Sequence, residues 1–199
     1  MEYIFNSAVI NAIIALLNGY NNVKNCEFED TRTKIDIDSY TYLIGQCIRQ
    51  YQVPENHYFT SEQARKLWDE LTDDDICRFP GKGSFKCKVE IDYDKYVGSR
   101  KTPEKSHAAK GDEIKFNNVF HYDHMVPVSL ISDKLCSLDR PTYDDIESIL
   151  VNIYICRITK AEDRGMPYTK GRTLDFKQVY TEIYKTHKII IERLEKVIK

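Results

Sequence analysis

Apolar residues change their spacing along this chain. In residues 6–18 they recur every three or four positions, as on one face of a helix, and residues 38–52 repeat the pattern. Residues 84–97 instead alternate polar and apolar side chains, which is typical of a half-buried strand or hairpin. The two periodicities together predict an α+β fold. With 199 residues, of which 42% are hydrophobic, the chain is long enough to form a core of its own.

The other expected elements follow from the same patterns and from local start and stop signals. The first helix is expected to end at Asn18-Gly19, because glycine often follows a helix. A third helix is expected from Thr60, which has capping-box spacing to Gln63. The remaining predictions are a strand at 113–121, a loop, a helix at 142–151 capped by Thr142, a strand at 153–158, a short helix from Thr159, and a long amphipathic helix at 173–199.

Charge and composition limit the function. The chain has 29 Lys and Arg against 31 Asp and Glu, a balance that argues against nonspecific coating of nucleic acid. The six cysteines form no CxxC pair, so the usual structural zinc signature is missing and buried, reduced thiols are expected. The longest apolar run, residues 8–17, is too short to cross a bilayer, and no secretion signal is evident. We therefore expect a cytoplasmic protein without a membrane partner.

The stretch that carries chemistry is FHYDHMVPVSLI, residues 120–131. Asp123 and His124 stand next to each other at the end of an expected strand, and Pro127 then stops regular strand pairing. A carboxylate is a preferred ligand of Mg²⁺ or Mn²⁺, and an imidazole that is largely neutral near pH 7 can take a proton from water. For His121, two residues earlier, packing or support of such a site is favoured over a direct role.

The phrase YDHMVP resembles the first half of the HNH endonuclease motif, and NIYICRITKAEDRGM at residues 152–166 resembles its second half. The resemblance covers about 45 residues and implies a ββα-metal module within a mainly helical chain that also contains a small hairpin. It implies that Asp123 is a metal ligand, that His124 is the general base, and that Asn152 holds the loop. Asp163 would be the second ligand of one Mg²⁺ or Mn²⁺ ion, with Glu162 as the alternative.

Basic residues near this motif are candidates for contacts with nucleic acid. Lys160, Arg164 and Arg157 lie on or beside the expected helix that follows the second strand. Lys101 and Lys105 belong to a basic segment, residues 98–110, which is either a solvent-exposed connector or a phosphate-binding loop.

Three segments of the chain are expected to have different roles. Residues 1–110 would form a helical and hairpin region available for target recognition. Residues 111–172 would form the catalytic module, and the amphipathic helix at 173–199 would pack on the core.

The resemblance implies a divalent-metal-dependent endonuclease that cuts double-stranded DNA. Its biological setting would be a type II restriction system, a phage or a mobile element, and a palindromic target would require a homodimer. The alternative is a noncatalytic nucleic-acid or protein-binding module on an HNH scaffold whose metal site has decayed, with Asp163 at the usual Asn position as its best support. An RNA-directed nuclease is a third possibility.

Overall fold

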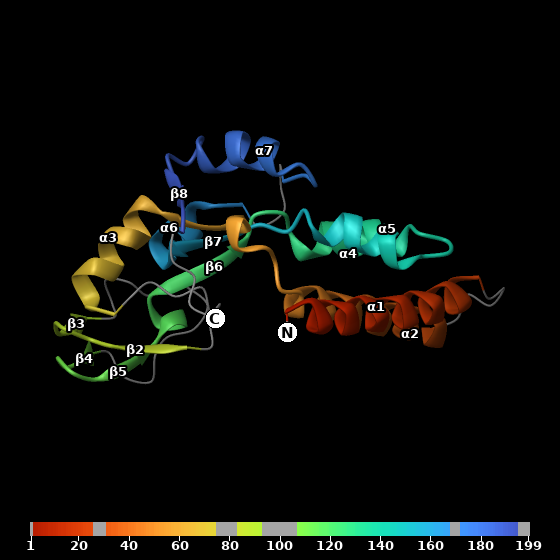
Figure 1. The fold of residues 1–199 in the computed structure, drawn as a ribbon, viewed down its shortest axis with the longest axis horizontal. Coiled ribbons are helices and arrows are strands. Elements are labelled where there is room, and N and C mark those ends of the chain that lie inside the picture. Colours follow the sequence, from red (N-terminus) through yellow and green to blue (C-terminus); the bar gives the residue numbers. More distant parts are fainter. Residues whose placement is uncertain (1, 26–30, 75–82, 93–106, 168–171, 195–199) are drawn as a thin grey trace. The chain divides into compact units, whose positions relative to one another are not determined.

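The computed structural model describes residues 2–25, 31–74, 83–92, 107–167 and 172–194 (Figure 1). The chain divides into two compact units. The helical unit comprises Met1–Pro54, Val126–Ile153 and Thr173–Phe176, and the sheet unit comprises Glu55–Met125, Tyr154–Arg172 and Lys177–Lys199. The predicted α+β class is confirmed. None of the helices in the described parts of the chain has the length and apolar character needed to cross a bilayer.

The helical unit contains α1 (Glu2–Lys24), α2 (Thr31–Gln50), α4 (Val128–Cys136) and α5 (Tyr143–Leu150). The prediction that the first helix ends at Asn18-Gly19 is wrong, because α1 continues through both residues. A Cβ on Gly19 would lie 2.6 Å from the Tyr40 hydroxyl oxygen of α2, closer than any real packing contact. Gly19 therefore leaves room for the Tyr40 ring against α1, and a side chain at this position would displace that ring.

Of the two later helices of this unit, α5 agrees with the prediction from the sequence and α4 does not. Thr142 caps α5 as predicted: its hydroxyl accepts a hydrogen bond from Asp145 N, and the Asp145 carboxylate accepts one from Thr142 N. The loop expected between residues 121 and 142 contains α4, which starts directly after Pro127. Helix α4 is only nine residues long, too short to show a clear helical repeat in the sequence. The core of the unit is mainly apolar, with Ser132 as a buried polar residue, and includes Ile10, Ile13, Leu17, Ile44, Ile48, Val128, Leu135, Ile146 and Leu150.

The sheet unit is built on four strands in the order β6-β7-β1-β8, namely β6 (Phe120–His124), β7 (Ile155–Thr159), β1 (Tyr58–Ser61) and β8 (Ile191–Arg193). Strands β6 and β7 are antiparallel, β7 and β1 are parallel, and β8 is antiparallel to β1. Figure 1 shows β6 and β7 side by side with α6 (Lys160–Gly165) directly after β7. The sequence therefore places two strands and a helix in the predicted order.

The hairpin predicted at residues 84–97 is not formed by neighbouring strands. Strand β2 (Ser84–Lys86) pairs with β5 (Glu113–Lys115), and β3 (Ile91–Asp92) pairs with β4 (His107–Ala108). Both pairs are antiparallel and join segments more than ten residues apart, which alternation within one segment cannot reveal. Residues 93–97 lie outside the described part.

The predicted helix over residues 173–199 is wrong beyond its first turns. Helix α7 (Phe176–Val179) passes into a π-helical turn at Tyr180–Tyr184. Lys188 then adopts a positive φ of 58°, which an L-residue rarely does and which ends helical structure, and the chain turns into β8. Residues 195–199 lie outside the description. Apolar residues in this segment fill the sheet's edge as well as one helix face.

Helix α3 (Glu62–Leu71) begins two residues after the predicted start, with Ser61 and not Thr60 as its cap. Its Trp68 is the centre of the aromatic core of the sheet unit. The indole stacks on Phe116 at 5.2 Å between ring centroids, and it also contacts Phe85 and Phe120 at 5.1 and 5.9 Å. This core fixes α3 on the sheet.

Candidate active site on the β6–β7 pair

The register of β6 and β7 decides which side chains face the same way. Asp123 lies opposite Cys156, and His124 lies opposite Ile155. Because successive side chains of a strand point to opposite faces, His121, Asp123 and Cys156 share one face, called the site face below, and His124 lies on the other. The expected convergence of Asp123 and His124 is therefore not found. Strand β6 remains regularly paired with β7 through His124, so the expected break in strand pairing comes only after this residue.

The Asp123 carboxylate is held by two partners from later in the chain. Its Oδ2 accepts hydrogen bonds from Arg172 Nη1 at 2.6 Å and from the Tyr184 hydroxyl at 2.5 Å. The Arg172 side chain is 2% exposed and the Asp123 side chain 12%. Arg172 Nη1 also donates to the backbone oxygens of His124 and Met125. The guanidinium therefore fastens the exit of β6, a role that no sequence signal around residue 172 indicated.

Burial of the site face changes the pKa of two groups. Burial, followed by the charge of Asp123, raises the pKa of the Tyr184 hydroxyl well above its ordinary value of 10.0. Burial, again followed by the charge of Asp123, raises the pKa of the Cys156 thiol well above 9.0. Both groups are consequently protonated at neutral pH, and neither is a nucleophile there.

These shifts predict a loss of stability at alkaline pH. In the folded chain, Cys156 and Tyr184 keep protons that they release near pH 9 and 10 in the unfolded chain. Their contribution to the free energy of unfolding should therefore be fully present below about pH 9 and be lost as the pH rises further. Urea unfolding between about pH 8 and 10.5 measures this slope, and Cys156→Ala should make it shallower. An unchanged slope in that variant would show that the thiol is not protected in the folded chain.

His121 and Asp163 meet at the open part of the site face. His121 Nε2 lies 3.8 Å from the Asp163 Oδ1 of α6. The His121 side chain is 40% exposed and the Asp163 side chain 17%, so both groups are reached by solvent. The sequence favours packing or a supporting role for His121, whereas its position identifies it as the accessible imidazole of this face.

Glu162 serves the fold. Its Oε2 accepts hydrogen bonds from Thr159 N at 2.8 Å, from Thr159 Oγ1 at 3.0 Å and from Ser61 Oγ at 2.7 Å. The Thr159 hydroxyl in turn accepts from Glu162 N, which completes the predicted cap of α6. This carboxylate links the starts of α6 and α3, because Ser61 also caps α3.

Removal of this link should destabilise the chain. We expect Glu162→Ala to lower the free energy of unfolding by about 1 to 2 kcal/mol, as loss of a helix cap does. Urea denaturation gives the value, with Glu182→Ala on the exposed side of the π-helical turn as the control. Equal stability of the two variants would contradict a capping role.

Two further predicted site residues lie elsewhere. Asn152 lies two residues after the end of α5 in the helical unit and donates from its side-chain amide to Ser148 O in the last turn of that helix. The loop-holding role of Asn152 stays a prediction. Arg157 is 0% exposed: its guanidinium lies 4.9 Å from the Trp68 ring, and Nε contacts Thr60 Oγ1. The prediction that Arg157 contacts DNA is wrong, because the aromatic core covers it.

The remaining basic candidates differ in what the structure describes. Lys160 and Arg164 belong to α6, the former half-buried and the latter exposed. Lys101 and Lys105 lie outside the described residues. Of the predicted phosphate contacts, those of Lys160 and Arg164 are therefore the ones that involve described, solvent-accessible residues.

The expected metal ligands do not form a ready site. Within the described ranges, no three His, Cys, Asp or Glu side chains are placed to share an ion. Asp123 is neutralised by Arg172, and Glu162 caps a helix. Carboxylates and an imidazole are suitable donors in kind, but this arrangement does not fit a divalent cation unless Arg172 moves away from Asp123.

Comparisons with known proteins add no relative. Neither a family model nor a curated protein nor a solved structure matches this chain.

Proposed function

We propose that the chain is a divalent-metal-dependent endonuclease that hydrolyses phosphodiester bonds of DNA at the site face of β6 and β7. The observation that carries the proposal is the solvent-accessible pair of His121 and Asp163, which comes from an antiparallel strand pair and the helix that follows it. The same order of elements is implied by the resemblance of YDHMVP and residues 152–166 to the HNH motif.

In this proposal His121 takes a proton from the attacking water, and Asp163 stabilises the imidazolium that results. His121 replaces His124 as the proposed base, because His124 projects from the opposite face of the strand. Lys160 and Arg164 contact the phosphate backbone beside the site.

The metal requirement rests on the resemblance. Purified protein should nick supercoiled plasmid with Mg²⁺ or Mn²⁺ and leave it intact with EDTA. DNA that stays intact with either ion, at protein concentrations where binding is measured, would contradict the proposal. Matched DNA and RNA duplexes decide the substrate, and analytical ultracentrifugation with a palindromic product decides whether a homodimer forms.

A second candidate function has its own observation. Arg172 and Tyr184 both donate hydrogen bonds to the Asp123 carboxylate, as would be expected in a binding module whose metal site has decayed. In that case the protein binds nucleic acid or a protein without cleaving DNA, and His121→Ala behaves like the parent chain.

A further inference from the structure

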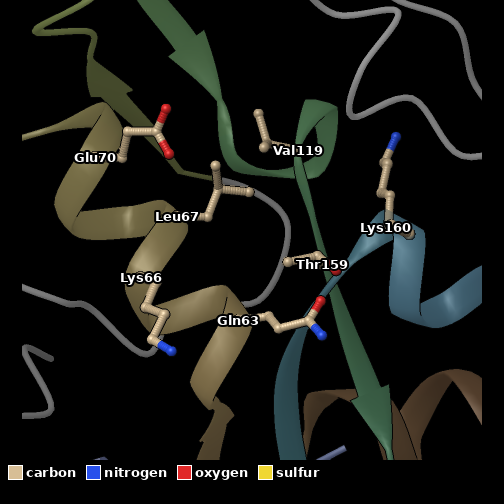
Figure 2. Close-up of a pocket in the computed structure, with 8 residues that line it drawn as sticks. Gln63, Lys66, Leu67, Glu70, Val119, Thr159 and Lys160 are labelled. Atoms are coloured by element: carbon tan, nitrogen blue, oxygen red, sulfur yellow. The ribbon is translucent and has the colours of Figure 1, made fainter. Parts of the chain in front are cut away.

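The pocket between α3 and the start of α6 has a volume of about 310 Å³ but is not built for a charged ligand (Figure 2). Its inner wall is closed to solvent, since Leu67 is 8% exposed and Val119 0%. Lys66 at its rim is paired with Glu62 at 2.6 Å, and Figure 2 shows its ammonium group directed away from Lys160. The pocket is therefore assigned no ligand, and the larger exposed apolar surface lies on α2 of the helical unit.

Helix α2 turns large apolar side chains away from its own unit. Six such side chains are exposed in the described part of the chain, and three of them lie on this helix: Ile35 is 59% exposed, Tyr42 66% and Leu43 46%. Residues seven and eight positions apart lie on the same side of an α-helix, because one turn takes 3.6 residues. The opposite side anchors the helix, since Ile44 and Ile48 are buried in the core. Exposed apolar residues that gather on one helix suit a contact with another protein surface.

Two opposite charges lie on the same side of α2. Asp38 and Arg49 are both exposed, and the 11 positions between them make about three helical turns, or about 16 Å along the axis. Among the described residues, Asp38 has no hydrogen bond or ion pair, and Arg49 donates to the backbone oxygen of Gly45 in its own helix but meets no carboxylate. Five residues are called the α2 face below: Ile35, Asp38, Tyr42, Leu43 and Arg49.

These charges decide how two copies of the α2 face fit together. In a parallel pair, Asp38 would meet Asp38 of the second copy and Arg49 would meet Arg49, so that like charges repel. In an antiparallel pair, each Asp38 meets Arg49 of the second copy, which gives two ion pairs. The two-fold axis then lies level with Leu43, and Tyr42 and Leu43 of the two copies pack against each other between the ion pairs.

We propose that the α2 face binds a second copy of this chain, with the two α2 helices antiparallel. A two-fold interface must be complementary to itself, and the α2 face meets this condition with apolar side chains between an acid and a base. A contact between single helices belongs to the small interfaces, so we expect a weak dimer with a Kd on the order of 10 µM. The inference goes beyond the proposed function, because this dimer forms without nucleic acid and without cleavage.

Sedimentation velocity of the full chain without DNA, at protein concentrations from about 1 to 100 µM, measures the association. The parent chain should shift from monomer to dimer over this range. Tyr42→Lys places a charge in the middle of the α2 face and should raise Kd at least about tenfold. Val151→Lys, at an exposed apolar residue directly after α5, should match the parent. Circular dichroism checks that each variant is folded.

Charge reversal tests the antiparallel arrangement. Asp38→Lys alone, or Arg49→Glu alone, brings like charges together twice in each dimer and should weaken association by about tenfold. An equimolar mixture of these two variants should recover the dimer. The two substituted side chains then attract each other across the interface, and so do the unchanged Asp38 and Arg49.

A parent chain that stays monomeric at about 100 µM, or that dimerises only with palindromic DNA, overturns the inference. A dimer that Tyr42→Lys leaves unchanged also overturns it, because another surface then makes the contact. Loss of the dimer in Tyr42→Lys without recovery in the mixture overturns the antiparallel arrangement. Plasmid cleavage is measured separately: cleavage by a monomeric parent chain overturns the dimer and supports the endonuclease, and a dimer that does not cleave does the reverse.

Discussion

Arg172→Ala should lower the free energy of unfolding by about 3 to 5 kcal/mol, because it leaves the buried Asp123 carboxylate without its countercharge. The guanidinium is nearly inaccessible and also binds the backbone at the end of β6, so the loss includes hydrogen bonds that water cannot replace. Urea denaturation at pH 7 measures the change. Arg164→Ala, which removes an exposed arginine from α6, should change stability by no more than about 0.5 kcal/mol.

A double variant separates charge from packing. Asp123→Asn in the Arg172→Ala background removes the buried charge but keeps a hydrogen-bond acceptor for Tyr184. It should recover part of the lost stability. If the double variant is as unstable as the sum of the two single variants, the ion pair contributes little and Arg172 acts through its packing and its hydrogen bonds to the backbone.

Elements set by local signals could be predicted from the sequence. Thr142 and Thr159 each start a helix with an acidic residue three positions later, and both caps form because the partners are fixed by spacing within one turn. The predicted bounds of the strand at 153–158 lie within two residues of those of β7, and the helix predicted from Thr159 begins one residue later.

Elements that depend on partners far away in the sequence could not be predicted in this way. Strands β1 and β8 are short, and β8 lies in a segment with helical spacing; it forms because Lys188 turns the chain back to pair with β1. Gly19 reads as a helix stop, although its role depends on Tyr40 of another helix.

The candidate site shows the same division. The sequence predicted the strand that carries Asp123 and the short helix that carries Asp163, and both elements are present. The sequence predicted His124, next to Asp123, as the imidazole of the site. The end of regular strand pairing cannot be predicted locally, because it depends on the pairing of β6 with β7 and on Arg172, 48 residues beyond His124. The prediction missed Arg172 and Tyr184, whose contacts with Asp123 have no local signature.

His121→Ala should lower the cleavage rate by about 100- to 10,000-fold, the usual effect of removing a general base. The variant should fold normally, because the ring is 40% exposed, and DNA binding should persist, because the base acts on the attacking water. His124→Ala provides the matched comparison on the other face of the same strand. It tests the residue that the motif resemblance implies against the residue that the strand geometry favours.

Single-turnover cleavage of a supercoiled plasmid with Mg²⁺, run side by side for the parent chain, His121→Ala and His124→Ala, tests the central claim most directly. The account predicts cleavage by the parent and by His124→Ala, and its loss in His121→Ala. Cleavage that survives without His121 but disappears without His124 would contradict the assignment of the site to the face shared by His121 and Asp163.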